Sequence, residues 1–338
     1  MTPHTAPPLP RVGLDNYGLL PLGLTPIATL EWATAHGADG VSFSGLPPEQ
    51  RAKVDRAALA DLAACARERG LYLEWGGGEH IPRDMTSWAR RDLAAVNRRA
   101  AEEAAALGVR VVRSCSGGLM RWQSESPPTE MLLREAARTL VEQRQMLRDH
   151  DVVLAIETHF EFSSHEIVRL LDMCDAAPGD WLGVCLDTMN LLTMLEEPVA
   201  AARRLLPWVV STHIKDGGVL VDDDGLTTFP TAVSDGVIDL AAIIRLLGTL
   251  SREVHLSVED HGGCFRVPIF DRLFLSRFPD VSVEELSALI RLSQASARKP
   301  SCTPLKREDW ATACEARVVR GVQALRHLAA QADSDDAA

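Results

Sequence analysis

The fold is decided by four short runs: Val153-Leu154-Ala155-Ile156-Glu157, Val184-Cys185-Leu186-Asp187, Val209-Val210-Ser211-Thr212-His213 and Val254-His255-Leu256-Ser257-Val258-Glu259. Each begins with apolar or β-branched residues, which predict a buried strand. Each then places a Glu, Asp or His at or just past the end of that strand. Active sites of barrels of parallel strands form at the carboxyl ends of the strands. The four runs therefore predict a barrel whose last four strands converge on one divalent metal.

The rest of the chain alternates in the same way. Eight candidate strands are separated by stretches of helical periodicity, which is typical of parallel βαβ units. The strands are expected at 11–14, 40–43, 71–75, 110–115, 152–156, 183–186, 208–212 and 254–258, and the helices at 26–36, 56–69, 85–107, 129–149, 164–176, 198–206 and 239–247. An open, doubly wound sheet of about six strands is the competing architecture. The count of eight and a span of about 250 residues favour a (β/α)₈ TIM barrel.

We expect three segments. Residues 1–10 form a disordered N-terminal tail, 11–298 form the barrel with the long loop and helix after its eighth strand, and 299–338 form a C-terminal helical extension and tail. Helices are expected at 283–294 and 307–330. The phenylalanines of this arm, at 265, 270, 274 and 278, could cover the mouth of the barrel, its underside or a second subunit. Asp222-Asp223-Asp224-Gly225 is interpreted as a charged, solvent-facing turn.

Composition excludes several classes of protein. The net charge of −12 argues against a nucleic-acid surface, which would be basic. No apolar run approaches the roughly 18 residues of a membrane span, and the N-terminus lacks the apolar core of a secretory signal. Seven cysteines without a CxxC pair indicate reduced thiols rather than disulfides or a thiolate zinc site. These features predict a cytoplasmic protein.

Each candidate ligand alone has an ordinary explanation, because a carboxylate can cap a helix and a histidine can simply pack. Together they are more specific, since Glu157, Asp187, His213 and Glu259 follow four successive strands at separations of 30, 26 and 46 residues. Three carboxylates and one imidazole suit a fairly hard ion such as Mn²⁺ or Mg²⁺.

From about residue 11 to 259 the chain resembles the xylose isomerase-like sugar phosphate isomerase/epimerase superfamily. The matching pieces are Ile156-Glu157, Leu186-Asp187-Thr188, His213-Ile214-Lys215-Asp216 and Val258-Glu259-Asp260. The resemblance implies that Glu157, Asp187, His213 and Glu259 hold one divalent metal, with Mn²⁺ the first choice and Mg²⁺ or Co²⁺ the alternatives. It also implies that Glu157 and Glu259 exchange the substrate's proton. The expected activity is therefore a metal-dependent sugar isomerase or epimerase that works through an enediolate.

Two departures from the family pattern keep other activities open. Asn190 stands where many sugar epimerases of this group have a histidine, and no arginine follows His213 closely. One alternative is a lyase or hydratase acting on a 3-keto sugar or glycoside, including elimination from C-glycosides with a partner subunit. An abasic-site endonuclease and a non-catalytic metal-binding scaffold are the remaining alternatives.

Further polar residues are expected at the barrel mouth. His159 is a candidate catalytic residue, either as a proton relay or as a hydroxyl contact. The candidate substrate-binding residues are Lys215, His80, Asn190, Trp75 and His261, with weaker candidates Asp15, Asn16, Arg113 and Ser114. The expected partner is a small carbohydrate, with no nucleic acid or membrane, and a homo-oligomer or partner subunit is possible.

Overall fold

The structure, a computed structural model, describes residues 10–336. Nearly all of the predicted N-terminal tail, 1–10, and the last two residues of the predicted extension lie outside this range. The division of the chain at residue 298 remains a prediction.

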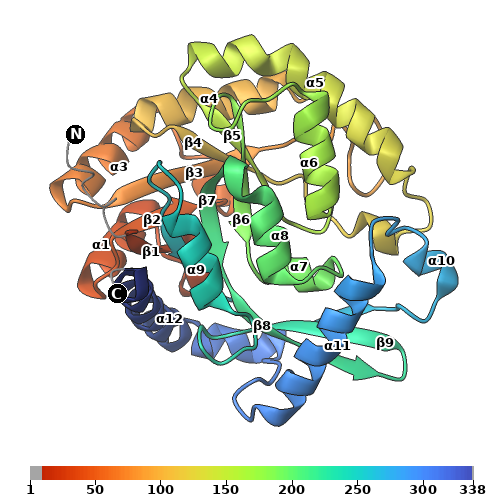
Figure 1. The fold of residues 1–338 in the computed structure, drawn as a ribbon. Coiled ribbons are helices and arrows are strands. Elements are labelled where there is room, and N and C mark those ends of the chain that lie inside the picture. The colour runs from red at the N-terminus through yellow and green to blue at the C-terminus, as the bar shows by residue number, and fades with distance from the viewer. Residues whose placement is uncertain (1–9, 337–338) are drawn as a thin grey trace, which may run out of the picture.

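Eight parallel strands close into a barrel, in the order β1-β10-β7-β6-β5-β4-β3-β2. This confirms the predicted (β/α)₈ fold. Figure 1 shows the helices surrounding the strands. The barrel strands are β1 (Val12–Asp15), β2 (Gly40–Phe43), β3 (Tyr72–Gly78), β4 (Val111–Ser114), β5 (Val153–Glu157), β6 (Leu182–Asp187), β7 (Val209–Ile214) and β10 (Leu256–Val258).

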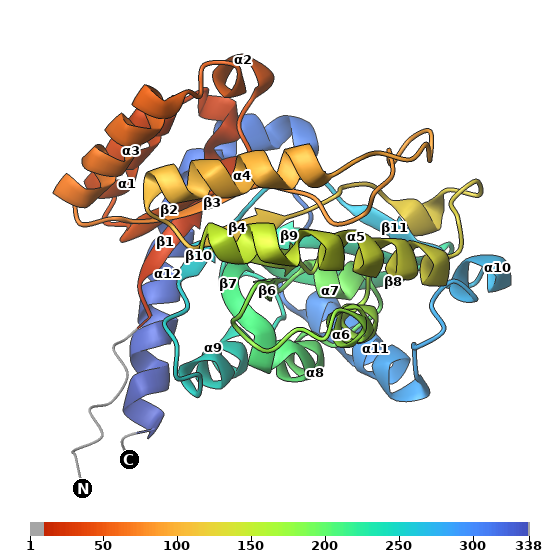
Figure 2. The ribbon, with the colours of Figure 1, turned by 90° about the horizontal axis from the view of Figure 1, so that it is seen from above.

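The outer layer consists of helices packed on the barrel. Helices α4 and α5 lie side by side outside β3, β4 and β5 (Figure 2). The main helices are α1 (Pro26–Ala35), α3 (Arg56–Glu68), α4 (Ala94–Leu107), α5 (Thr129–Asp149), α6 (Ser164–Met173), α8 (Pro198–Leu205) and α9 (Leu240–Gly248). Shorter helical turns are η1 (Asn16–Leu22), α2 (Pro48–Arg51), η2 (Met120–Trp122), α7 (Asn190–Thr193), η3 (Leu206–Trp208) and α10 (Arg272–Leu275).

One predicted helix starts later than expected. Residues 85–107 were expected to be helical, but α4 begins only at Ala94. The preceding segment is held as a loop because Asp84 accepts the N–H groups of Thr86 and Ser87 at 3.1 and 2.8 Å. Trp88 adopts a left-handed backbone, with φ of 59°. A side chain that bonds its own local backbone competes with helix formation.

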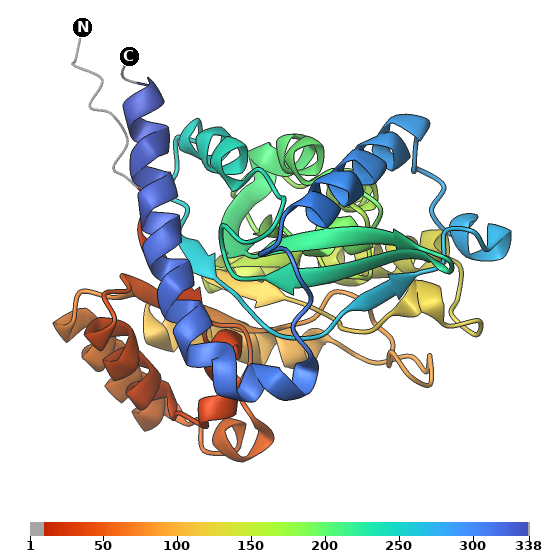
Figure 3. The same cartoon turned by 90° about the horizontal axis from the view of Figure 1, so that it is seen from below.

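A small antiparallel sheet interrupts the barrel between β7 and β10. It consists of β8 (Asp216–Asp222), β9 (Gly225–Thr231) and β11 (Phe265–Val267), in the order β11-β9-β8. The predicted charged turn at 222–225 is the turn of the β8–β9 hairpin. Helix α11 (Val283–Arg298) lies along β8 (Figure 3). Ser293 and Ser296 of α11 accept the N–H groups of Val221 and Val219, which protects this edge strand.

The C-terminal helix α12 (Arg307–Asp336) packs beside β1, β10, η1 and α9 (Figure 3). Phe274 and Phe278 of the preceding arm are buried against Trp122, whereas Phe270 is 60% exposed. Phe265 of β11 lies 4.5 Å from Phe160, between ring centroids, at the carboxyl end of β5. No helix of the described residues is long and apolar enough to cross a membrane.

Asp216 provides a test of this architecture. Its carboxylate accepts four backbone N–H groups, of Gly217 at 2.8 Å, Ser234 and Gly236 at 3.0 Å and Ile238 at 3.2 Å. Asp216→Asn puts an amide donor against N–H donors, so we expect the free energy of unfolding to fall by about 2–3 kcal/mol. Urea unfolding measures this. The exposed Asp223→Asn should leave stability unchanged, and equal stability of the two variants would contradict the role given to Asp216.

Candidate metal centre

The four predicted ligands meet at the carboxyl end of the barrel. Ligand atoms of Glu157, Asp187, His213 and Glu259 all lie within 4.8 Å of one another, and all four residues are buried. Glu157 ends β5, Asp187 ends β6, His213 lies in β7, and Glu259 follows β10. The parallel register pairs Asp187 directly with His213. Strand alignment thus brings the four side chains together.

His213 lies between carboxylates. Its Nδ1 is 2.9 Å from Glu157 Oε1 and 2.7 Å from Glu259 Oε2, and its Nε2 is 3.4 Å from Asp15 Oδ2. Burial disfavours protonation, but Cys185, Glu259 and Asp15 outweigh it and raise the pKa of His213 well above its usual range. The proton that this environment favours occupies a place that a metal ion could take.

Two cations keep the glutamates charged. Arg113 donates a hydrogen bond to Glu157, and Lys215 Nζ lies 2.7 Å from Asp187 Oδ2 and 3.2 Å from Glu259 Oε1. Burial opposes ionisation of Glu157, yet the charge of Arg113 lowers its pKa overall. Burial likewise opposes ionisation of Glu259, and Lys215 followed by His213 lowers its pKa well below the usual value. Both carboxylates are therefore available as anionic ligands.

The charge balance fits a divalent ion. Four carboxylates, of Asp15, Glu157, Asp187 and Glu259, share the centre with the cations Arg113 and Lys215. Glu74 is also buried near His213 and Asp15, and burial raises its pKa to about 8, which keeps that side chain neutral at pH 7. When the four carboxylates are ionised and His213 is neutral, two negative charges are left uncompensated. One divalent ion would balance them.

Unsatisfied polar atoms support the same interpretation. Both polar side-chain atoms of Asn190 are buried and have no hydrogen-bond partner within residues 10–336. Asp187 Oδ2 and Glu259 Oε2 are paired, at 2.7 Å from Lys215 Nζ and from His213 Nδ1 respectively. Buried polar groups are usually paired, so the unpaired amide beside Asp187 points to a ligand. Three carboxylates and an imidazole suit a hard to borderline divalent ion.

Asn190 and His159 lie close to this centre. Asn190 begins α7, and its backbone N–H, with that of Met189, donates to Asp187 Oδ1 at 3.0 Å. His159 Nδ1 lies 2.8 Å from Glu161 Oε2, and its ring is 4.2 Å from that of Phe160.

The remaining candidates occupy three different surroundings. His80 is fully buried, with Nδ1 3.0 Å from Ser114 Oγ. His261 Nδ1 lies 3.0 Å from the carbonyl oxygen of Gly262. Trp75 lies in the barrel wall, where its indole N–H donates to Glu103 of α4 at 3.0 Å. Substrate contacts of these three residues remain predictions.

Sequence reasoning gave little weight to residues that the structure places at the centre. Asp15 and Arg113 were weak candidates for sugar contacts, and they lie instead beside His213 and Glu157. Their position at strand ends was the available signal. Glu74, Cys115 and Glu161 were missed because nothing local distinguishes them from ordinary core or loop residues.

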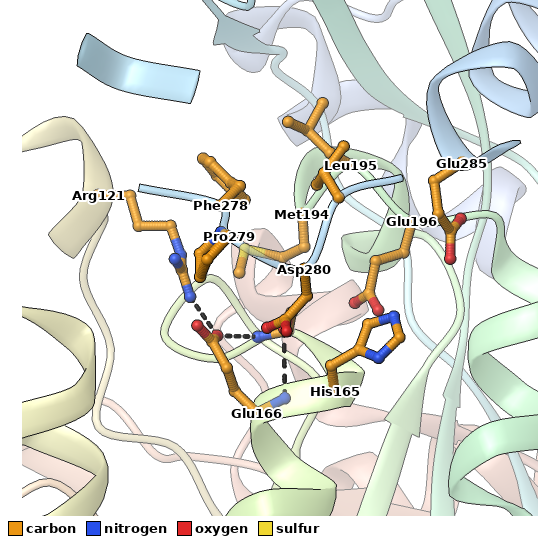
Figure 4. A pocket seen from close by; sticks show the side chains of 12 residues that line it. Arg121, His165, Glu166, Met194, Leu195, Glu196, Phe278, Pro279, Asp280 and Glu285 are labelled. Atoms are coloured by element: carbon orange, nitrogen blue, oxygen red, sulfur yellow. Dashed lines mark hydrogen bonds and ion pairs between the residues drawn. The ribbon is translucent and has the colours of Figure 1, made fainter. Parts of the chain in front are cut away.

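A separate polar pocket lies beside α6 (Figure 4). Arg121 and Glu166 form an ion pair there, each only 1% exposed. The ring of Phe278 lies 4.6 Å from the Arg121 guanidinium carbon. The pocket has a volume of about 10 Å³, which is room for one water molecule. It is therefore too small to be the substrate site.

The fold and the candidate ligand set define a class: a (β/α)₈ barrel with a buried cluster that could hold a metal ion. Residues 30–272, more than half of the chain, match the family model described as xylose isomerase-like TIM barrel. The chain belongs to this family.

Individual relatives are distant. A 3-oxo-isoapionate decarboxylase of Pectobacterium atrosepticum is 24% identical over 269 residues, which cover 73% of this chain and 84% of that protein. The uncharacterized protein YihM of Escherichia coli K12 is 28% identical over 83 residues, only 24% of its length.

Solved structures share the fold. An L-ribulose 3-epimerase aligns with a TM-score of 0.55 and 19% identity, covering 86% of this chain and 93% of that chain. A xylose isomerase-like TIM barrel protein from Mycobacterium smegmatis, in complex with magnesium, aligns with a TM-score of 0.57 and 16% identity, covering 83% and 98%.

Glu196, in the pocket of Figure 4, gives a prediction of pH dependence. It accepts the backbone N–H of Ser164 at 2.8 Å and lies 3.1 Å from Arg204, which also pairs with Glu285. Burial raises the pKa of Glu196 from 4.5 to about 7. Because the folded state holds this proton more tightly, the stabilisation is full below pH 4.5 and is lost as the pH rises through 7.

We expect Glu196→Gln to flatten the decline in the free energy of unfolding over this pH window. Urea unfolding at several pH values measures the slope. The exposed Glu142→Gln on α5 is the matched control and should keep the wild-type slope. An unchanged slope in Glu196→Gln would show that another group is responsible.

Proposed function

We propose that the protein is a divalent-metal-dependent isomerase or epimerase that moves a proton on the carbon next to a carbonyl of a small carbohydrate. The observation that carries the proposal is the pair of glutamates in the ligand set. They come from the outer strands of the group β10-β7-β6-β5, and both contact His213 Nδ1, at 2.9 and 2.7 Å. Two carboxylates at one centre suit removal and return of a proton.

The metal would be held by Glu157, Asp187, His213 and Glu259, with Mn²⁺ the first choice and Mg²⁺ or Co²⁺ the alternatives. When bound, such an ion supplies positive charge that stabilises negative charge on neighbouring substrate oxygens. The magnesium complex of the Mycobacterium smegmatis relative supports an ion of this class.

The protein's own side chains would then divide the remaining tasks. Glu157 and Glu259 exchange the carbon-bound proton, Arg113 and Lys215 orient them, and Asn190 contributes its unpartnered amide to a substrate hydroxyl. His159, which pairs with Glu161, serves as a proton relay at the mouth. His80, His261 and Trp75 complete the proposed substrate-binding set.

A lyase is the second candidate function. The decarboxylase relative supports it, as do the two cations at the centre and the non-titrating Asn190. In a 3-oxo acid, cleavage of the carbon–carbon bond releases CO₂ and leaves the electron pair as an enolate, which a proton then quenches. Elimination from a 3-keto glycoside would generate the same negative charge. Both reactions therefore rely on the same metal ligands to stabilise that charge.

The expected setting is the reducing cytoplasm. All seven cysteines lie in the described part of the chain and are unpaired, which supports this proposal. Exposed apolar side chains of the C-terminal arm, Phe270, Leu273 and Val283, support contact with a second subunit.

Proton exchange in D₂O tests the first function. We expect deuterium incorporation next to the carbonyl, with a rearranged sugar, when ketoses and aldoses are followed by NMR. Glu259→Gln should lower the exchange rate about 10²- to 10⁴-fold, the usual contribution of a general base. The exposed Glu308→Gln is the control and should exchange at the wild-type rate.

The same assay separates the two candidate functions. Release of CO₂ from a 3-oxo sugar acid, or of the aglycone from a 3-keto glycoside, without a rearranged sugar would favour the lyase. If neither exchange nor release occurs with metal-loaded protein, both functions are wrong. Metal content of Glu259→Gln must be measured beside its rate, because Glu259 is also a proposed ligand.

Metal binding has its own test. Mn²⁺ at about 100 times its Kd should add about 2.7 kcal/mol to the free energy of unfolding. Asp187→Asn removes one of three anionic ligands and should lose most of this gain. Thermal unfolding with Mn²⁺ and with a chelator measures both effects. Asp223→Asn, on the exposed hairpin turn, should respond like the wild type, and a full response of Asp187→Asn would contradict the ligand assignment.

A further inference from the structure

A second group of metal-binding side chains lies at the mouth of the barrel. Atoms of Cys115, His159 and Glu161 lie within 4.8 Å of one another. Cys115 follows β4, and the other two residues lie in the segment after β5. His159 Nδ1 is 2.8 Å from Glu161 Oε2, and Cys115 Sγ is 3.7 Å from Glu161 Oε1. None of these residues is a ligand in the first group.

The cluster is anchored on one side and open on the other. The Glu161 side chain is 1% exposed, and its Oε1 accepts the backbone N–H of Gly117 at 2.5 Å. The imidazole of His159 is 21% exposed, and Cys115 is partly exposed. A fixed carboxylate beneath an accessible thiol and imidazole gives an ion a route to the site.

His80 supplies an independent observation. It is fully buried, and its Nε2 finds no hydrogen-bond partner anywhere in residues 10–336. Its Nδ1 is held by Ser114 Oγ at 3.0 Å, and its backbone N–H donates to Ser116 Oγ at 3.1 Å. Its ring lies 5.7 Å from that of Phe162. His80 therefore contacts both segments that carry the cluster and adds a buried, unpaired imidazole nitrogen to this part of the barrel mouth.

We propose that Cys115, His159 and Glu161 form a second metal site for a thiophilic divalent ion such as Zn²⁺. When this ion is bound, His159 is a ligand and does not act as a proton relay. One sulfur, one nitrogen and one oxygen donor make a borderline-soft ligand set, whereas the first centre offers three oxygens and one nitrogen. Mn²⁺ and Mg²⁺ would favour the first centre and Zn²⁺ the second. Binding at the second site releases the thiol proton to solvent, since cysteine ligates as the thiolate.

Cobalt spectroscopy tests the second site directly. The purified, full-length protein is stripped with a chelator and titrated with Co²⁺, which gives a thiolate-to-metal charge-transfer band when sulfur is a ligand. We expect the intensity of this band to saturate at one thiolate-bound Co²⁺ per chain. Cys115→Ser should abolish it, whereas Cys264→Ser, which changes an exposed cysteine, should retain it. Asp187→Asn should also retain the band because it alters only the first centre.

Two results would overturn the proposal: no thiolate band in the wild type with excess Co²⁺, or a band that persists in Cys115→Ser. If Cys115→Ser does not fold, His159→Gln replaces it. The Co²⁺ affinity measured from the thiolate band should then be at least 10-fold weaker, and wild-type affinity would contradict the site. Native mass spectrometry with Zn²⁺ should give one more ion for the wild type than for Cys115→Ser. The proposed function is tested separately, since proton exchange or CO₂ release does not require this band.

Discussion

Compensation of buried negative charge is the constraint on which the centre of this barrel depends. Asp15, Glu74, Glu157, Asp187 and Glu259 all lie inside, where an unpaired carboxylate is costly. The structure meets this cost by making Glu74 neutral and by placing Arg113, Lys215 and His213 among the others. A divalent ion would complete the balance. The same charges that destabilise the fold would then favour binding of that ion.

The sequence revealed the barrel because buried parallel strands are nearly continuous apolar runs. β5 and β6 are buried at every position, and each ends in a candidate ligand. The β8–β9 hairpin escaped detection because Gly217, Gly218 and Pro230 are unfavourable in ordinary strands. Here the glycines face close neighbours: a Cβ on Gly218 would lie 2.5 Å from both Cys302 Sγ and the Phe229 ring. That requirement comes from tertiary packing, which a local pattern cannot reveal.

The candidate ligands could be predicted, but their partners could not. Strand ends identify which side chains reach the mouth, and the register of the closed barrel brings them together. Which cation contacts which carboxylate depends on side-chain conformation and on residues far apart in sequence. Arg113 and Glu157 are separated by 44 positions, as are Lys215 and Glu259. The Cys115 cluster joins two loops in the same way, and neither loop alone carries a metal-binding motif.

The C-terminal helix contributes to the centre as well as to the outer layer. Arg317 of α12 holds Asp260 through two hydrogen bonds, at 2.5 and 2.7 Å. Asp260 directly follows the candidate ligand Glu259, so this bidentate pair restrains the chain just past β10, the shortest barrel strand. A three-residue strand offers little register of its own. The extension thus restrains the residue next to the candidate ligand Glu259, and the arm before it brings Phe265 into contact with Phe160, the neighbour of His159.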